Sequence, residues 1–217
     1  NIQEYSDWVN EQIESVPSVL EKLFAFTVVC VNGKLGLFFV INHIIADAWT
    51  LSKIGENFVK LYNAKLIGDS YDVKLNSYIK LMQDENEYVN SERDIKDKEF
   101  WKDQMTKCNE LVVLANHPAN TMKSDRVQIK LSYDKSKKII DFCKEEQISE
   151  YVLYIAAMGA VFHEQTQADD FYIGSTLLNR TGRIRKNALG LFANTVPIYI
   201  SYKEKDMSIF DYITSVK

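Results

Sequence analysis

Two apolar segments on either side of an Asn-Gly pair most restrict how this chain can fold. Residues 24–31 read FAFTVVCV, residues 35–41 read LGLFFVI, and Asn32 and Gly33 lie between them. Asparagine followed by glycine readily adopts the positive φ angles that a tight hairpin turn requires. The pattern therefore predicts a β-hairpin. Because both strands are almost continuously apolar, it also predicts a sheet that is covered on both faces.

The hydrophobic period changes directly after the second strand. Apolar residues then recur at helical spacing, which predicts an amphipathic helix over about residues 48–65. Asp47 stands in the N-cap position of this helix, where a side-chain oxygen can accept a hydrogen bond from the first turn. The local order is therefore strand, short loop over residues 42–47, and helix.

The rest of the chain alternates between helical and strand patterns. A charged segment at residues 84–105 predicts an exposed helix, and a small, polar segment at 115–125 predicts a linker. The other expected elements are helices at 7–22, 135–146 and 150–165, and strands at 127–132, 170–177 and 194–201. This is a mixed α/β (α+β) pattern with a break near residue 120. It predicts parts of two lobes, residues 1–120 and 121–217.

Composition excludes several classes of protein. The formal net charge of −4 gives no electrostatic reason to expect a nucleic-acid partner. No apolar run approaches the ~20 residues that span a bilayer, and the N-terminus does not resemble a signal peptide. Three widely spaced cysteines, Cys30, Cys108 and Cys143, predict neither a disulfide framework nor a metal site. We expect a cytoplasmic protein, with Cys30 and Cys143 packed in the core.

The segment Asn42-His43-Ile44-Ile45-Ala46-Asp47 carries the residues best suited to chemistry. A histidine at the exit of a strand is held firmly, and imidazole titrates close to neutral pH, as proton transfer requires. Taken alone, however, the spacing H-x-x-x-D favours a structural histidine followed by a helix-capping aspartate. The flanking sequence is needed to decide between these interpretations.

Three ordered motifs resemble those of the condensation domains of nonribosomal peptide synthetases. The family pattern H-H-x-x-x-D-G, which follows an apolar strand, is similar to residues 42–48, with Asn42 at the first histidine and Ala48 at the glycine. The segment from Tyr88 through Ser91 and Glu92 to Trp101 resembles a second family motif. The block at 189–197, LGLFANTVP, is similar to I-G-x-F-V-N-T-x-P, and the strand at 170–175 precedes it as in the family.

The resemblance implies a two-lobed fold like that of chloramphenicol acetyltransferase, incomplete at both ends, since both ends of the chain have helical patterns. It implies that the amine of an acceptor aminoacyl thioester attacks a donor acyl or peptidyl thioester. Both substrates arrive on phosphopantetheine arms of carrier proteins, and the domain itself binds no cofactor. The implied partners are peptidyl and aminoacyl carrier proteins and adjacent synthetase domains, with no membrane. We expect the 217-residue piece to be inactive alone, with exposed strand edges that favour self-association.

Specific residues follow from the motif match. His43 aligns with the second histidine of the motif, which the resemblance implies is catalytic, either as general base or in positioning the amine. Asp47 and Asn42 are implied to be structural, and the family's arginine partner of Asp47 is expected in an upstream segment that this chain lacks. Residues implied to line the tunnel or the lobe interface are Trp49, Asn194, Thr195 and Arg180. For Arg180 and its basic neighbours, a solvated loop is the better interpretation.

Other functions stay open. A related acyltransferase would use His43 on an alcohol acceptor, with a coenzyme A or carrier thioester as donor, although the block at 189–197 favours condensation. An epimerisation domain shares the histidine motif, but Asn194-Thr195 fits condensation better. A heterocyclisation domain is disfavoured, because it carries aspartate at the position of His43. A condensation-like domain that only docks partners is the alternative outside catalysis, and the retained His43 argues against it.

Overall fold

The computed structural model describes residues 1–14, 20, 22–108, 112–113, 127–204 and 206–216. They form two compact units, Asn1–Val89 with Leu177–Asn194, and Asn90–Thr176 with Thr195–Lys217. These units do not divide the chain at residue 120, because the second unit includes residues from both sides of that point. The assignment of residues 1–120 and 121–217 to the lobes of the family fold stays a prediction. The predicted linker at 115–125 lies outside the described residues.

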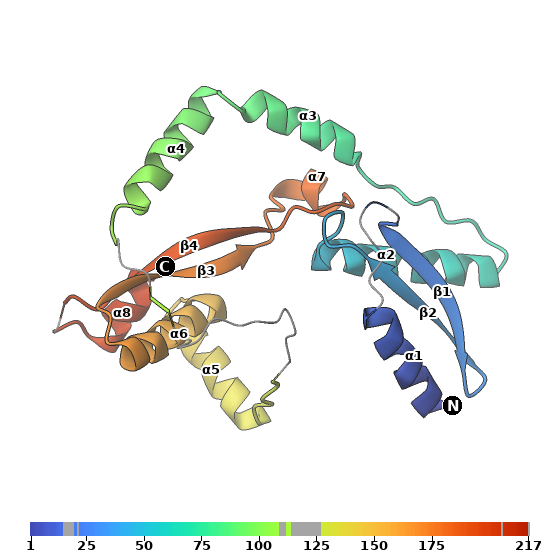
Figure 1. Ribbon diagram of the computed structural model, residues 1–217, viewed down its shortest axis with the longest axis horizontal. Helices are drawn as coiled ribbons and strands as arrows, with labels where there is room; N and C mark the ends of the chain where they lie inside the picture. Colours follow the sequence, from blue (N-terminus) through green and yellow to red (C-terminus); the bar gives the residue numbers. More distant parts are fainter. Residues whose placement is uncertain (15–19, 21, 109–111, 114–126, 205, 217) are drawn as a thin grey trace. The chain divides into compact units, whose positions relative to one another are not determined.

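The first unit contains the predicted hairpin. Strands β1 (Phe24–Val31) and β2 (Lys34–Ile41) pair antiparallel, from Phe24 opposite Ile41 to Val31 opposite Lys34 (Figure 1). The turn between them uses positive φ angles of 49° at Asn32 and 76° at Gly33. The Asn-Gly pair therefore makes the turn that the sequence predicts.

Thr50 and Ile54 border one face of this hairpin near Phe24 and Phe26, and among the described residues a helix lies along just the opposite face. Helix α1 (Ile2–Glu14) lies against it, with the Trp8 and Phe38 rings edge to face at 4.9 Å. Phe26 and Val28, on the other face, are 50% and 71% exposed. The expectation of a sheet covered on both faces is wrong for the described residues, and Cys30 on the same open face is exposed rather than in the core. The unbroken apolar pattern does not show which segment covers each face.

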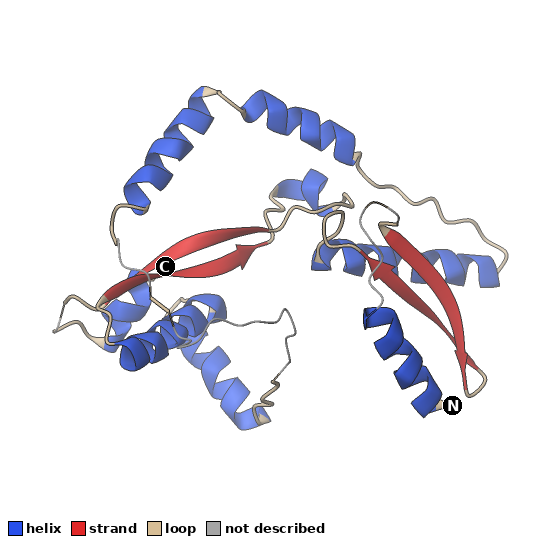
Figure 2. Ribbon diagram, viewed as in Figure 1, coloured by secondary structure: helices blue, strands red, loops and turns tan. Residues whose placement is uncertain are grey.

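Helix α2 (Ala48–Leu66) follows the hairpin as predicted, and α3 (Tyr78–Tyr88) and the short α7 (Gly182–Lys186) complete the helices of this unit (Figure 2). The predicted helix at 7–22 begins earlier, since α1 starts at Ile2 and ends at Glu14. The predicted helix at 84–105 is two helices, α3 and α4 (Glu92–Gln104). Asn90 breaks it with a φ of 65°, and the Ser91 side chain then caps α4 by accepting from the Asp94 N–H.

The second unit packs helices against a strand pair. Helices α5 (Tyr133–Glu145), α6 (Glu150–Thr166) and α8 (Ile209–Ser215) lie beside β3 (Asp170–Leu177) and β4 (Asn194–Ser201). The Tyr202 N–H, just after β4, donates to the Asp169 carbonyl, just before β3, so the two strands run antiparallel. The shared core is Cys143, Ile148, Ile155, Ala156, Phe171, Ile173, Ile200, Tyr212 and Ile213.

One expected strand is absent. Residues 127–132 form no strand in the structure, and Val127 and Ile129 are 88% and 86% exposed. A strand needs a neighbour for its backbone N–H and C=O groups, and no described segment pairs with this one. The buried position of Cys143, by contrast, agrees with the core role predicted for it. The predicted mixture of helices and short sheets, an α+β fold, is confirmed.

Candidate functional site

His43 lies in the turn that connects β2 to α2. Its side chain is exposed, and it borders a cavity of about 290 Å³. The other residues around this cavity come from the chain just before β1, from β1 and from the end of β2: Lys22, Leu23, Phe24, Ala25, Val40, Ile41 and Asn42. The predicted catalytic imidazole is therefore accessible beside a mostly apolar hollow, which suits a reagent that arrives from outside.

Asn42 fixes the beginning of the His43 loop with three hydrogen bonds. Its N–H donates to the Leu23 carbonyl at 2.8 Å, which continues the hairpin pairing by one residue. Its own carbonyl accepts from the Ile45 N–H at 3.1 Å, and its side-chain Oδ1 accepts from the Ile44 N–H at 3.0 Å. The side-chain bond is an Asx-turn, in which the asparagine oxygen replaces a backbone acceptor.

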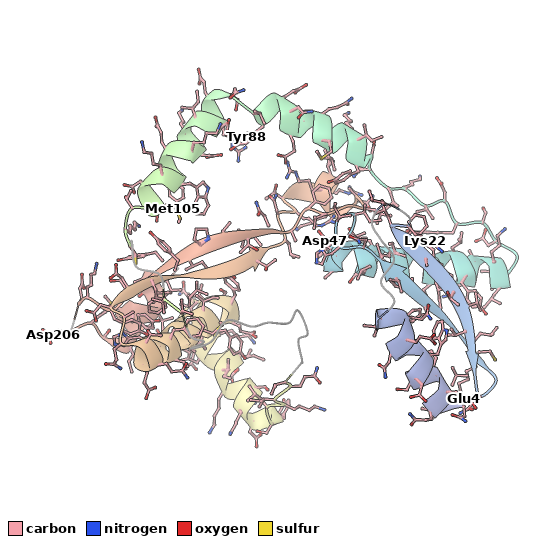
Figure 3. All side chains as sticks on the ribbon, in the orientation of Figure 1. Glu4, Lys22, Asp47, Tyr88, Met105 and Asp206 are labelled. Carbon is pink, nitrogen blue, oxygen red and sulfur yellow. The ribbon has the colours of Figure 1, made fainter. Side chains whose placement is uncertain are left out.

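Asp47 fixes the other end of the loop, at the start of α2 (Figure 3). It has the extended backbone of an N-cap residue, and its Oδ1 accepts from the Thr50 N–H at 2.8 Å. Its side chain is only 2% exposed, so its charge needs close partners. The Phe192 and Ala193 N–H groups supply two of them by donating to Oδ2 at 3.1 and 3.3 Å.

Arg180 is the ionic partner of Asp47. Its Nη2 lies 2.9 Å from Oδ1 and 3.1 Å from Oδ2 of the carboxylate, and its Nε donates to Oδ2 at 3.3 Å. The side chain is 1% exposed. Two expectations are therefore wrong: the partner is not in a missing upstream segment, and Arg180 is not in a solvated loop. Since 133 residues separate the pair, no local pattern reveals it.

The remaining donors of the Arg180 guanidinium are also satisfied. Nη1 donates to the Arg185 and Ala188 carbonyls, each at 2.8 Å, and Nη2 donates to Thr50 Oγ1 and to the Gly190 carbonyl. The face of the group lies 4.2 Å from the Phe192 ring centroid, a cation–π distance. Arg180 thus joins the residues around α7 to the N-terminus of α2 as a buried clamp.

The electrostatics of this clamp keep Asp47 ionised. Burial raises the pKa of Asp47, but the hydrogen bonds from Arg180, Thr50 and Phe192 together outweigh it and lower the pKa to about 2. A carboxylate so firmly held in its charged form is a poor proton acceptor near neutral pH. The structure thus gives Asp47 the contacts of an anchor for the loop, as the resemblance implies.

Thr50 and Gly190 belong to the same cluster, although no sequence pattern points to Thr50. The Thr50 hydroxyl donates to the Gly190 carbonyl at 2.7 Å and accepts from the Gly190 N–H at 3.0 Å. Gly190 has a φ of 151°, and the Tyr78 ring stands where a Cβ would project. The glycine of the block at 189–197 is therefore required for close backbone approach. A buried polar residue in the first turn of a helix gives little signal in a sequence.

The other predicted site residues lie in different settings. The Trp49 indole donates to the Lys186 carbonyl at 3.0 Å, so its polar edge holds α2 to α7. Asn194 and Thr195 open β4 and are exposed, and their place at a lobe interface stays a prediction. His163, which is outside the predicted site, lies in the last turn of α6, with Nδ1 2.7 Å from the Ala168 carbonyl.

The part of the chain that the structure describes has neither a metal-binding cluster nor a membrane-spanning helix. It contains no cluster of three or more His, Cys, Asp or Glu side chains that could hold a metal ion. None of its helices is both long enough and apolar enough to cross a membrane.

Comparison with known proteins identifies the family. The sequence model of the Condensation domain matches residues 4–217, which is nearly the whole chain. The chain belongs to the condensation-domain family. A plipastatin synthase subunit of Bacillus subtilis (strain 168) is 27% identical over 220 residues, covering 98% of this chain and 8% of that protein. Surfactin synthase subunit 1 of the same organism is 25% identical over 202 residues, 91% of this chain and 6% of that protein.

Solved condensation domains have the same fold. The first condensation domain of the CDA synthetase superposes with a TM-score of 0.83 at 18% identity, covering 99% of this chain and 49% of that one. VibH, a condensation enzyme of nonribosomal peptide synthesis, gives a TM-score of 0.78 at 19% identity, covering 98% and 51%. The chain thus spans about half the length of these solved condensation domains and a small part of the synthetases that resemble it.

Proposed function

We propose that this chain carries the histidine-bearing part of a domain that forms peptide bonds between two carrier-bound substrates. The observation that supports this most directly is an exposed His43 on a loop whose two ends are fixed by different means. Asn42 ties the beginning of the loop to the residue before β1, and Asp47 ties its end to Arg180. An accessible imidazole on a rigid loop suits a group that must meet substrate in one defined orientation.

The proposed reaction joins an acceptor amine to a donor thioester. The amine nitrogen attacks the thioester carbonyl carbon, a C–N bond forms, the C–S bond breaks, and the proton lost by the amine balances the released thiolate. His43 takes part either by accepting that proton or by orienting the amine and stabilising developing charge. An α-amino group has a pKa near ~8, so part of it is already neutral at neutral pH, and orientation then matters as much as deprotonation.

The proposed partners follow from this chemistry. Both thioesters are delivered on phosphopantetheine arms of carrier proteins, which are expected on adjacent domains of the same synthetase or on associated proteins. The plipastatin and surfactin synthases that resemble this chain are proteins of which it matches only a small part, which supports a multidomain setting.

Replacing His43 with Ala in the complete gene product tests the proposal. We expect H43A to abolish condensation, because it removes the exposed imidazole that is proposed to meet the substrates, while both carriers are still loaded with their acyl groups. The assay measures dipeptide on the acceptor carrier by mass spectrometry of the phosphopantetheine arm. Dipeptide formation by H43A at a rate close to wild type contradicts catalysis and supports a docking domain. An ester formed with a hydroxy-acid acceptor, but no amide, supports the O-acyltransferase instead.

A further inference from the structure

The residue before His43 carries a further inference, which rests on the proposed function. Asn42 has the only side chain of the loop, among those described, whose bond is to the backbone immediately around His43. Its Oδ1 accepts from the Ile44 N–H at 3.0 Å, so the peptide group after His43 is held by the residue before it. With the Ile45 N–H bonded to the Asn42 carbonyl, the backbone on both sides of the imidazole is fixed.

The hydrogen-bond acceptor at position 42 decides whether this turn depends on pH. A carboxamide oxygen accepts a hydrogen bond and does not titrate at any pH at which the protein is folded. A histidine, which the family pattern has at position 42, could accept from the same N–H only through an unprotonated ring nitrogen. The two residues can therefore make the same turn near neutral pH, but only asparagine keeps it when the pH falls.

We propose that Asn42 is a positioning residue for His43, which it holds through the Asx-turn to Ile44, and that its amide makes the loop geometry independent of pH. Asn42 has no part in proton transfer. Its effect on the rate comes entirely from the orientation of the neighbouring imidazole.

The ionisable groups near position 42 are few and can be separated. His43 itself is adjacent, and Lys22 lies across the small cavity that both residues border. Asp47 ends the loop, but it stays charged throughout the pH range of the test described below, because the pKa of this carboxyl is about 2. A change in pH dependence on substituting Asn42 therefore reports the introduced group, or its effect on His43 or Lys22.

The test compares four variants of the complete gene product with wild type in single-turnover condensation, with both carriers preloaded, from about pH 5.5 to 9. Loss of one hydrogen bond that orients the loop predicts that N42A is roughly tenfold slower, with carrier loading unaffected. N42D keeps an oxygen in the same place and should recover to within about threefold of wild type. The rate of N42H should be close to that of wild type at about pH 8. Below about pH 7 its rate should fall more steeply than that of wild type, as expected when one additional proton inactivates the variant.

A second readout does not depend on turnover. Exchange of the Ile44 amide hydrogen, followed in the peptide that contains it, should be slow in wild type and N42D, and at least about tenfold faster in N42A. In N42H it should be slow at about pH 8 and accelerate, relative to wild type, once the introduced imidazole is protonated. Exchange that is equal in wild type and N42A overturns the inference even in a protein that makes no peptide.

The fourth variant, H43A, separates the two proposals. If H43A is inactive but N42A reacts at the wild-type rate, the inference about Asn42 fails and the proposed function stands. If H43A reacts at the wild-type rate, the proposed function fails, and the exchange data alone then decide whether Asn42 holds the loop. An N42H profile parallel to that of wild type refutes the pH argument.

Discussion

Replacing Arg180 with Met removes the buried partner of Asp47 while keeping a side chain of similar length. Asp47 then stays buried at 2% exposure, with backbone N–H groups of Thr50, Phe192 and Ala193 as its remaining donors. Removing one member of a buried ion pair typically destabilises a protein by about 3–5 kcal/mol, since the other charge loses its compensation. Because three donors remain on the carboxylate, we expect R180M to fall at the lower end of this range.

The pKa of Asp47 gives an independent value for the free energy by which its ionised side chain stabilises the fold. The pKa falls from 3.8 to about 2 on folding, which corresponds to about 2–3 kcal/mol at ~1.36 kcal/mol for each pKa unit. Because the folded pKa is the lower one, this stabilisation is present above about pH 4 and is lost as the pH falls toward 2. R180M loses the strongest interaction that lowers the pKa of Asp47, so its stability should change less over this acidic range.

Urea unfolding of the complete domain, followed by tryptophan fluorescence, measures both effects. Trp49 is a suitable reporter because its indole binds the Lys186 carbonyl within the same unit. The control is a double-mutant cycle with D47A, R180A and the double variant, in which the pair should show a coupling free energy of about 2 kcal/mol. If the changes in the free energy of unfolding caused by D47A and R180A simply add in the double variant, the view that the pair holds the loop is refuted. A urea midpoint of R180M equal to that of wild type would refute it as well.

Two further predictions concern positions at which the structure offers a matched control or a simple physical readout. G190A should reduce the free energy of unfolding by about 2–5 kcal/mol, because a Cβ would meet the Tyr78 ring and the backbone has a φ of 151°. The control is G68A, at which φ is 74° and the space is open, and it should lose only about 1 kcal/mol. Equal losses in the two variants would contradict the role of the contact with Tyr78. The isolated 217-residue chain should self-associate through the open hairpin face and should form no peptide bond. V28K changes a position that is 71% exposed on that face, and it should shift the chain toward monomer in light scattering. A wild-type chain that is monomeric and active would contradict both parts.

Local signals in the sequence predict most of the elements around the site. The positive φ angles of Asn32 and Gly33 confirm the hairpin turn, and Asp47 caps α2 as its position before the helix predicts. Both depend on neighbouring residues, which is why a sequence pattern contains them. The break at Asn90 has a local signal too, since Ser91 with Asp94 is a helix N-cap pattern, but the charged periodicity of the segment obscures it.

The remaining features depend on residues far apart in the chain. The strand predicted at residues 127–132 fails because β-branched composition supplies no partner strand. The basic neighbours of Arg180 predict an exposed loop, and only the fold brings its guanidinium to Asp47. The contact of Thr50 with Gly190 likewise joins positions 140 residues apart. The sequence therefore predicts the loop and the aspartate that ends it, but not Arg180, the side chain that clamps this aspartate.

The distance along the chain between Asp47 and Arg180 also orders events during synthesis. Arg180 lies 133 positions after Asp47, and the ribosome needs roughly 7–27 s to reach it at ~5–20 residues per second. During this time the hairpin and α2 can already form, but the carboxylate that caps α2 has no guanidinium to bind. The His43 loop of a nascent chain therefore has its first anchor, at Asn42, well before its second. Any ribosome pause or truncation before residue 180 leaves the His43 loop without the Arg180 clamp.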